Sequence, residues 1–317
     1  MTRWPTMVAR AEDYLAVRRA LGFQLRIEGA ELLRFARFAD DVGGAGPVTI
    51  DLALRWATRP RDCSRLYLAR RLDIVRRFAR YRAHFDAGTE LPPRGLLGPS
   101  YRRLEPHIFT AAEIAALLGA ARTLPTRWAL RPKTYFTLLG LLVTSGLRIS
   151  EALRLLRADV DLETGVLTVR ASKFLGARLV PVDSSVTAVL RDYAAQRDAR
   201  HPRPRSETFF VSAYGTSLKY VKVRATFAVL RQVLPRQSGS GRWPPRIHDI
   251  RHTFAVTRLL RWYEEGGEIG NKIAFLSTYL GHAKVTDTYW YLTACPELLA
   301  VTAARFERFA QASEVER

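Results

Sequence analysis

The sequence predicts a mainly α-helical protein with a small antiparallel sheet, organised as two regions joined by a linker. Three observations lead to this prediction. Apolar residues recur at helical spacing through most of the chain. One pair of segments, 166–170 and 178–182, is typical of two strands joined by a turn. A stretch with three prolines and three glycines, residues 87–105, separates the two regions.

The composition favours a folded protein with a polyanionic partner. The chain has 317 residues, of which 48% are hydrophobic and 25% charged, and it is long enough for two domains. Lysine and arginine number 50 against 30 acidic residues, which gives a formal net charge of +20. Such a surplus favours binding to a polyanion, and nucleic acid is the usual partner.

Several features argue against a secreted or membrane protein. The first residues lack the apolar segment of a signal peptide. The longest uncharged apolar run lies between Lys133 and Arg148, short of the roughly 20 residues that span a bilayer. Cys63 and Cys295 form no C-x-x-C motif and cannot make a four-ligand zinc site alone. We therefore expect a reduced, cytoplasmic protein without a membrane segment.

The first region, residues 1–86, is predicted to consist of helices. Apolar residues are periodic between Tyr14 and Phe38, and Gly22 interrupts the pattern, so one helix ends there and the next begins. Another helix is expected to begin near Asp51, and a further one covers about residues 64–85.

The helix expected at 64–85 carries many arginines and few acids to neutralise them. A solvated charged face is one interpretation; we favour a face that follows DNA phosphates. The predicted DNA contacts on this helix and in the linker are Arg70, Arg71, Arg76, Arg77, Arg80, Arg102 and Arg103.

The second region, residues 106–317, is expected to be helical apart from the strand pair. Thr110 and Glu113 form a capping box that begins a helix. Four segments of this region carry polar side chains of chemical interest. They contain Arg148 with Glu151, Lys173 in the turn between the strands, His248 with Arg251 and His252, and His282 followed by Tyr289 and Tyr291.

Each segment taken alone has an ordinary explanation. Arg148 and Glu151 are spaced as a surface pair on a helix, and a turn lysine is usually solvated. Two histidines four residues apart can bind zinc, but the H-E-x-x-H motif requires glutamate where Asp249 stands. We therefore disfavour a metal site. Aromatic residues near a helix, as after His282, usually belong to a core.

Taken in order, the segments read R-x-x-E, K in a β-turn, H-x-x-R-H, L-G-H and a tyrosine nine residues after that histidine. This order and spacing resemble the tyrosine recombinase (phage integrase-like) family of site-specific DNA recombinases. The resemblance covers the whole second region. It implies a two-domain DNA clamp, with a helical core-binding domain at 1–86, a linker at 87–105 and a catalytic domain with a C-terminal helix at 106–317.

The resemblance also implies the residue roles and that no cofactor or metal is needed. The residues that match the family's catalytic set are Arg148, Lys173, His248, Arg251, His282 and Tyr291, with Glu151 and His252 in support. The chemistry explains these residue types. Guanidinium groups neutralise charge that grows on the phosphate oxygens. A tyrosine hydroxyl, with a pKa near ~10, needs cationic neighbours as it loses its proton. A lysine can protonate the leaving 5′ oxygen.

The implied function is site-specific recombination of double-stranded DNA for integration, excision or transposition of a mobile element, through a 3′-phosphotyrosyl intermediate. Members of the family act as tetramers on two DNA sites, so we expect a homo-tetramer, alone or with related recombinases, near the bacterial nucleoid. By the same resemblance, the helix expected at 297–310 would contact an adjacent protomer. Two alternatives stay open: a type IB-like topoisomerase, and a DNA-binding architectural or regulatory protein without catalysis.

Two departures from the family pattern stand out. The distance along the chain from Arg251 to His282 is longer than expected, and residues 263–271 look like an inserted loop. Tyr289 stands two residues before Tyr291, and on a helix the two point to different faces. The expected spacing selects Tyr291 as the nucleophile.

Overall fold

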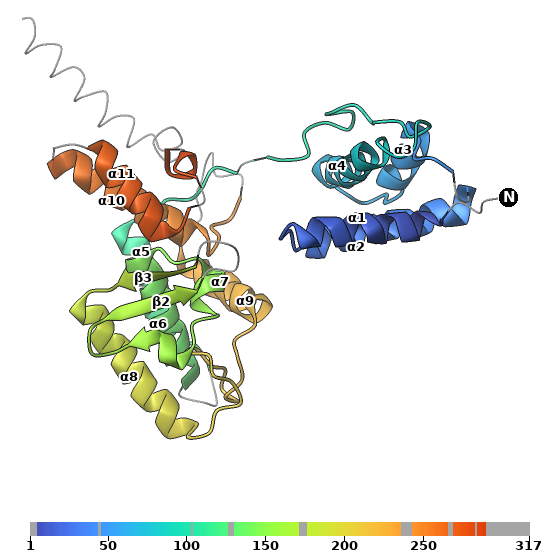
Figure 1. Cartoon of the computed structure of the whole chain (residues 1–317). Coiled ribbons are helices and arrows are strands. Elements are labelled where there is room, and N and C mark those ends of the chain that lie inside the picture. The colour runs from blue at the N-terminus through green and yellow to red at the C-terminus, as the bar shows by residue number, and fades with distance from the viewer. Residues whose placement is uncertain are drawn as a thin grey trace, which may run out of the picture. The chain divides into compact units, whose positions relative to one another are not determined.

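The mainly helical fold with a small antiparallel sheet is confirmed (Figure 1). The computed structural model describes residues 5–43, 46–102, 104–125, 130–170, 176–235, 243–265, 269–282 and 284–289. The chain divides into two units, Met1–Leu104 and Glu105–Arg317. Within the described ranges, no helix combines the length and apolar character that crossing a membrane requires.

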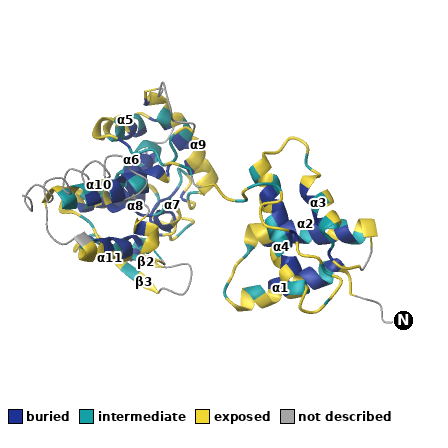
Figure 2. Cartoon of the chain, turned by 90° about the horizontal axis from the view of Figure 1, so that it is seen from above, coloured by how far each residue is buried: buried dark blue, intermediate teal, exposed yellow. Residues whose placement is uncertain are grey.

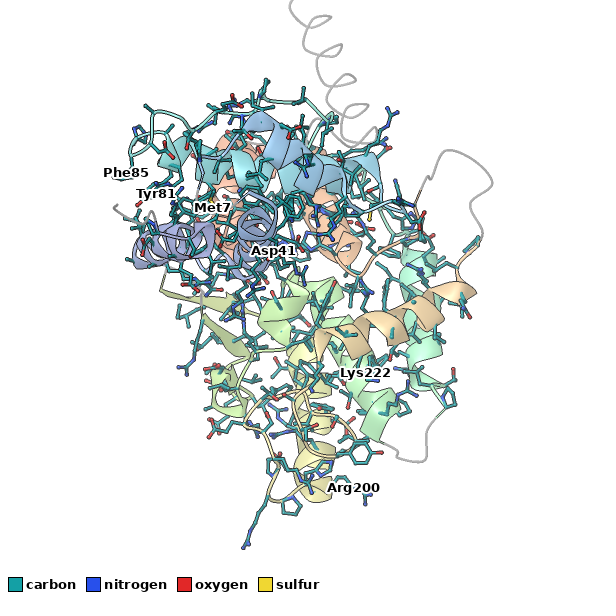
Figure 3. All side chains as sticks on the ribbon, turned by 90° about the vertical axis from the view of Figure 1, so that its right-hand side faces the viewer. Met7, Asp41, Tyr81, Phe85, Arg200 and Lys222 are labelled. Atoms are coloured by element: carbon teal, nitrogen blue, oxygen red, sulfur yellow. The ribbon has the colours of Figure 1, made fainter. Side chains whose placement is uncertain are left out.

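The first unit is a group of packed helices. Its described helices are α1 (Met7–Ala20), α2 (Arg26–Gly43), α3 (Ile50–Thr58) and α4 (Arg65–Arg82). Gly22, at φ +83°, follows the end of α1, so the predicted helix break is confirmed. Each helix turns its buried side toward the others (Figure 2). Phe35, Trp56 and Phe78 lie in the shared core, and the rings of Tyr81 and Phe85 lie 5.1 Å apart at its margin (Figure 3).

Much of the segment expected as a linker packs onto this first unit. The amide of Glu90 donates to the carbonyl of Val48 at 2.8 Å, and the Glu90 carboxylate accepts from the amide of Ile50 at 2.7 Å, at the first residue of α3. The Arg76 Nε donates to the carbonyl of Pro92 at 2.8 Å. The first unit accordingly extends to Leu104 and takes in most of the segment expected as a linker.

Arg71 has a structural place in the first unit. Its side chain is 9% exposed, it lies 3.4 Å from the Glu31 carboxylate, and its Nη2 donates to the Trp56 carbonyl at 2.9 Å. The guanidinium also stacks over the Trp56 ring at 3.8 Å. These contacts join α2, α3 and α4, so Arg71 faces inward, contrary to the expectation that it contacts DNA.

The second unit surrounds one large core. Its described helices and strands are α5 (Ala111–Arg122), α6 (Leu130–Ser145), α7 (Ile149–Ala152), β1 (Val160–Asp161), β2 (Val166–Arg170), β3 (Ala177–Pro181), α8 (Ser184–Arg200), α9 (Tyr220–Leu230), α10 (Asp249–Glu265) and α11 (Ile269–Leu280), with short 3-10 turns at Arg157–Asp159 and Arg231–Val233. The predicted capping box of Thr110 and Glu113 is present on α5. The strands pair antiparallel in the order β1-β2-β3, with Val169 opposite Arg178. The short strand β1 was not predicted.

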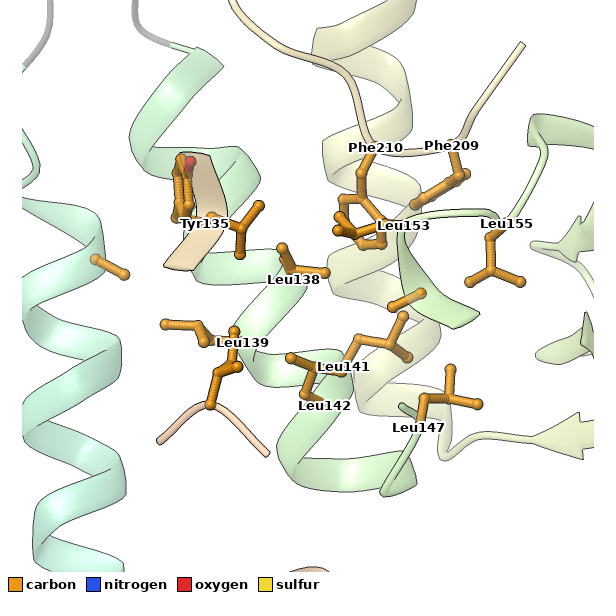
Figure 4. Packing of buried hydrophobic residues seen from close by; sticks show 14 of the residues in the cluster. Tyr135, Leu138, Leu139, Leu141, Leu142, Leu147, Leu153, Leu155, Phe209 and Phe210 are labelled. Carbon is orange, nitrogen blue, oxygen red and sulfur yellow. The ribbon is translucent and has the colours of Figure 1, made fainter. Parts of the chain in front are cut away.

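Helix α6 lies at the centre of this core. It is apolar on several sides, and Leu138, Leu139, Leu141 and Leu142 are all buried (Figure 4). A helix surrounded by apolar neighbours needs no single apolar stripe, which explains why its sequence is hydrophobic almost throughout. It ends at Ser145, and Gly146 follows it immediately before the segment that carries Arg148.

The expectation of an inserted loop at 263–271 is wrong in extent. Residues 263–265 belong to the last turn of α10 and residues 269–271 to the first turn of α11. Helices α10 and α11 lie side by side, with a buried cluster that includes Val256, Leu259 and Leu276 between them. The described parts of residues 263–271 therefore belong to a packed pair of helices.

Gly146 is the position where an added side chain should damage the fold most directly. Its φ is +61°, and its Cβ would lie 2.8 Å from Cγ of Phe254 and closer still to Cδ1. We expect Gly146→Ala to lose about 1–2 kcal/mol from the left-handed backbone and a further 1–3 kcal/mol, roughly, from overpacking. The measurement is urea unfolding.

Gly176→Ala is the matched control, because Gly176 has φ +65° but no described atom within 4 Å of an added Cβ. It should lose the backbone contribution alone. Equal losses in the two variants would contradict the steric argument for Gly146.

Candidate active site

The candidate active site is centred on the carboxylate of Glu151, in the short helix α7. The side chain is 8% exposed. Its Oε2 accepts from the backbone amide of Arg148 at 2.9 Å, so the carboxylate caps the beginning of its own helix. Its two oxygens also accept from the guanidinium groups of Arg148 and Arg178, and the guanidinium of Arg251 lies 4.0 Å away.

Arg148 is the most exposed of these three arginines, at 37% of its side chain. Its Nη1 donates to Glu151 Oε1 at 3.0 Å, and both Nη atoms lie 3.1 Å from the Gly281 carbonyl oxygen. The predicted pairing of Arg148 with Glu151 is therefore present, but it belongs to a buried cluster rather than to a helix surface.

Arg251, in the first turn of α10, is buried at 3% exposure. Its Nη1 donates to the Gly146 carbonyl at 2.9 Å and its Nη2 to the Leu280 carbonyl at 2.8 Å. The Nη1 also lies 4.0 Å from Glu151 Oε2. The two arginines predicted to hold a phosphate, Arg148 and Arg251, are thus brought to one place.

Arg178, on β3, is the third guanidinium, and the sequence analysis missed it. Its Nη1 and Nη2 donate to the two oxygens of Glu151 at 3.1 and 2.9 Å, and its Nε donates to the Tyr279 carbonyl at 2.9 Å. An arginine in a strand has no local pattern that marks it, because its partners lie far away along the chain. A weak signal was its position on the strand that follows the turn of Lys173.

The end of α11 explains why these arginines gather there. Gly281 has φ +68°, its amide donates to Thr278 and that of His282 donates to Ser277, which is the Schellman arrangement. The carbonyls of residues 279, 280 and 281 then face the arginines, and each accepts from one of them. A helix C-terminus carries partial negative charge, so cations are favoured at this position.

The cluster carries more positive than negative charge. Burial alone would raise the pKa of Glu151, but hydrogen bonds from Arg178 and from the Arg148 amide outweigh it and the pKa is lowered. Glu151 is therefore an anion at neutral pH. Three guanidinium groups share this one carboxylate, which leaves an excess of two positive charges beside an accessible face of Arg148. Such a place attracts an anion.

The predicted histidines flank this cluster. His248 precedes α10, and its ring lies 4.7 Å from that of His252 in an edge-to-face arrangement. The pKa of His248 is lowered, first by lost hydration and then by the charge of Arg251. The pKa of His282 is lowered to about 4, because burial and the charges of Arg251 and Arg148 disfavour its cation.

Thr288 positions the ring of His282. It is fully buried, and its Oγ1 lies 2.7 Å from His282 Nδ1. A neutral imidazole has one donor and one acceptor nitrogen, so this bond through Nδ1 fixes the orientation of the His282 ring. Thr288 had not been singled out in the sequence.

Several predicted residues lie outside the described part of the chain. They are Arg103, Lys173, Tyr291 and residues 297–310. Residues 171–175 join β2 to β3, so Lys173 belongs to the connection preceding the strand of Arg178. Tyr289 is described and is 47% exposed. Within the described ranges, no three His, Cys, Asp or Glu side chains are grouped as metal ligands.

The other predicted DNA contacts are in the first unit. Arg70, Arg77 and Arg80 are exposed along one side of α4, and Arg102 is exposed beyond it. Arg77 pairs with Asp73 at 2.6 Å. The pKa of Arg76 is lowered by lost hydration and by the nearby charges of Arg80 and Arg94, a sign of crowded positive charge.

Comparison with known proteins agrees with this geometry. Residues 107–297 match the model of the Phage integrase family, which is more than half of the chain. The chain belongs to the phage integrase family. Its resemblance to tyrosine recombinases is thereby confirmed, and so is the class of enzyme, a tyrosine recombinase.

Individual relatives extend the match to the first unit. An integrase/recombinase of Sinorhizobium fredii, y4rB, is 42% identical over 302 residues, which is 94% of this chain and 96% of the relative. The tyrosine recombinase XerC of Chlamydia trachomatis is 29% identical over 72% of this chain and 67% of the relative.

Solved structures share the fold of this family member. The Tn1549 transposon integrase in complex with transposon right end DNA superposes with a TM-score of 0.67 at 18% identity, over 96% of this chain and all of that chain. A lambda integrase dimer bound to a core site gives 0.57 at 17% identity, over 89% of this chain and 76% of that chain.

The lowered pKa of His282 predicts a pH dependence of stability. As the pH falls from 6.5 toward 4, the unfolded chain takes up a proton at this position and the folded chain does not, so the free energy of unfolding falls. A His282→Gln variant lacks this loss. As the pH is lowered through this window, we expect the urea midpoint of the wild type to fall further than that of the variant. A variant that is less stable at pH 7 should therefore approach the wild type.

The direct measurement is the NMR titration of the His282 ring, with an expected midpoint near 4. His84→Gln, a change at an exposed histidine of the first unit, is the control for the stability series. A midpoint above 6, with equal pH dependence in all three proteins, would contradict the prediction.

Proposed function

We propose that this tyrosine recombinase cleaves and rejoins double-stranded DNA at specific sites through a 3′-phosphotyrosyl link to Tyr291. The observation that carries the proposal is the cluster of three guanidinium groups around the single carboxylate of Glu151. Its excess positive charge suits a phosphodiester, whose own charge is −1 and whose oxygens gain further charge in the transition state.

In the proposed reaction, Arg148 and Arg251 hold the non-bridging oxygens of the scissile phosphate. Their present partners are mostly neutral carbonyls, those of Gly146, Leu280 and Gly281. When Arg148 and Arg251 donate to a phosphate instead of, or in addition to, these carbonyls, they form stronger, charge-assisted hydrogen bonds. The binding of the anion is therefore favoured over the free arrangement.

The remaining steps move protons. The Tyr291 oxygen attacks phosphorus and loses its proton, for which a neutral histidine beside the arginines, His248, is the acceptor. The lowered pKa of His248 keeps it unprotonated at neutral pH. Lys173 donates a proton to the leaving 5′ oxygen, and His282 donates through Nε2 to a phosphate oxygen. Attack by another 5′-hydroxyl reverses the link and joins new strands.

The first unit would contribute affinity for DNA through α4. Arg70, Arg77 and Arg80 project from one side of the helix, and Arg102 adds charge nearby in the chain. Arg71 is left out because its guanidinium is buried. Phosphate contacts of this kind hold DNA without reading its sequence.

The biological setting proposed is the movement or resolution of a mobile element by a homo-tetramer on two DNA sites, with residues 297–310 contacting an adjacent protomer. Two findings support a role in element movement: the similarity to an integrase/recombinase over nearly the whole chain, and the fold shared with a transposon integrase. We place the protein in the cytoplasm, near the nucleoid.

The decisive variant is Tyr291→Phe, which should abolish covalent attachment to DNA because the nucleophilic oxygen is missing. Tagged protein is expressed in its host and denatured without crosslinker, and the DNA that remains attached is sequenced. Tyr289→Phe is the matched control, since Tyr289 is an exposed aromatic residue two positions away, and it should keep attachment. Loss of attachment in Tyr289→Phe with retention in Tyr291→Phe would overturn the assignment.

The distribution of attached DNA separates the alternatives. Attachment at a few sites supports a site-specific recombinase, whereas attachment at many sequences supports a topoisomerase. Intact DNA binding with no covalent attachment in the wild type supports a protein without catalysis.

The role of α4 is tested by the salt dependence of DNA binding. The triple variant Arg70→Ala/Arg77→Ala/Arg80→Ala should lower affinity and reduce the slope of log affinity against log salt by up to about 3, since each phosphate contact contributes roughly 0.9. Binding to a duplex of unrelated sequence is measured between 50 and 200 mM salt, about the range where such losses are large.

The control is Arg203→Ala/Arg205→Ala, which removes exposed arginines from the segment after α8. Its slope should stay closer to that of the wild type. A greater effect in this control than in the α4 variant would place the phosphate-contacting surface elsewhere.

A further inference from the structure

Arg178 is the one member of the central cluster for which the proposed reaction gives no role. Its side chain is 17% exposed, while that of Arg148 is 37% exposed. All three nitrogens of the guanidinium have protein partners: Nη1 and Nη2 bind Glu151, and Nε binds the Tyr279 carbonyl. Each nitrogen of the Arg178 guanidinium therefore donates to a protein group.

These contacts connect parts of the site that are far apart in sequence. Arg178 lies on β3, Glu151 on α7 and Tyr279 at the end of α11. A second bond, from the Tyr279 hydroxyl to the Pro181 carbonyl at 3.4 Å, holds the same strand to the same helix. β3 follows the connection that carries Lys173, and α11 leads into His282 and the segment of Tyr291. Arg178 therefore lies where the strand that follows Lys173 along the chain meets the helix that leads to His282.

The packing around the guanidinium leaves little freedom. A Cβ on Gly281 would lie 2.7 Å from Arg178 Nη1 and 2.9 Å from Cζ, so the glycine backbone passes directly against the guanidinium. The bidentate contact with a carboxylate also fixes its plane. Arg178 is held in a single orientation from two sides.

The charge distribution indicates what Arg178 does for its neighbours. It supplies two of the hydrogen bonds that Glu151 accepts and so satisfies both carboxylate oxygens. Without it, a buried anion would face Arg148 and Arg251 alone, and it would draw both guanidinium groups toward itself. Arg148 already touches Oε1 at 3.0 Å, and Arg251 lies 4.0 Å from Oε2, so only short movements are needed.

We propose that Arg178 is a positioning residue, which neutralises Glu151 and fixes the end of α11 so that Arg148 and Arg251 stay available to the scissile phosphate. This inference rests on the proposed function, because the phosphate is the ligand that Arg148 and Arg251 would bind. Arg178 itself makes no contact with DNA in this role. Its loss therefore slows the chemical step and leaves affinity for DNA almost unchanged.

The test uses the full-length protein and a duplex that carries a site recovered by covalent capture, nicked so that the cleaved end dissociates. Arg178→Met should slow single-turnover formation of the covalent adduct by about 10- to 100-fold, the range for displaced orienting groups. The dissociation constant for the same duplex should change by less than about twofold, because many phosphate contacts determine it.

Arg170→Met is the matched control. Arg170 lies on the neighbouring strand β2 and also pairs with a buried carboxylate, that of Asp159, at 2.7 Å, but outside the central cluster. It should leave the adduct rate unchanged. If Arg178→Met does not fold, Arg178→Lys replaces it, since lysine keeps the charge but cannot bind both carboxylate oxygens and Tyr279 together; a slower adduct rate is expected here too.

A double-mutant cycle separates positioning through Glu151 from a general structural effect. In a Glu151→Gln background, Arg178→Met should slow the reaction by less than about threefold, because the charge to be neutralised is gone. Two outcomes would overturn the proposal. In the first, the rate losses of Glu151→Gln and Arg178→Met multiply in the double variant. In the second, Arg178→Met or Arg178→Lys forms the adduct as fast as the wild type does.

Hydrogen exchange distinguishes failure of this proposal from failure of the proposed function. The amides of Gly281 and His282 close the end of α11, so their exchange should quicken in Arg178→Met and not in Arg170→Met, whether or not DNA is cleaved. If the wild type forms no adduct, the proposed function fails. Unchanged exchange at Gly281 and His282 removes the structural basis of the positioning role.

Discussion

The whole candidate site depends on one buried carboxylate. Removing a carboxylate from water is costly unless hydrogen bonds replace its hydration, and Glu151 receives them from a backbone amide and from two guanidinium groups, with a third guanidinium nearby. Those guanidinium groups must themselves be solvated. At the end of α11, three carbonyls that have no amide partner within the helix accept hydrogen bonds from these guanidinium groups. The Glu151 carboxylate and the carbonyls at the end of α11 together hold the three guanidinium groups in place.

Glycine backbone makes this arrangement possible at both ends. Gly146 follows the end of α6 and Gly281 follows the end of α11, each with a positive φ. The carbonyl of Gly146 accepts from Arg251 and that of Gly281 from Arg148. Each glycine also lies against a side chain that a Cβ would strike, Phe254 in one case and Arg178 in the other. The glycines of the T-S-G-L-R and L-G-H segments are therefore part of the site, although they contribute no chemistry.

Short-range spacing in the sequence predicted the helical content, the strand pair and the break at Gly22, whereas the convergence of Arg148, Glu151 and Arg251 was implied by the family resemblance. It did not distinguish among arginines. Arg71 and its neighbours on α4 look alike in a sequence. Arg71 nevertheless points inward, because it binds Glu31 and stacks on Trp56, which lie on other helices. Arg178 was missed for the same reason: its partners are 27 and 101 residues away. The inserted loop was wrong in extent because most of residues 263–271 belong to the ends of α10 and α11.

Two of the buried carboxylates that bind arginine in the described part of the chain, Glu31 and Glu151, show what separates a structural cluster from a reactive one. Glu31 balances the charge of the buried Arg71 and also binds Arg34, which is exposed to solvent. The Trp56 ring covers Arg71, so the buried pair is closed. Glu151 is buried to a similar degree but faces three guanidinium groups, one of them substantially exposed. The three guanidinium groups outnumber the carboxylate beside them, and burial together with their charge keeps the nearby histidines neutral. An excess of fixed positive charge, held by groups that cannot move away, is a binding site for an external anion.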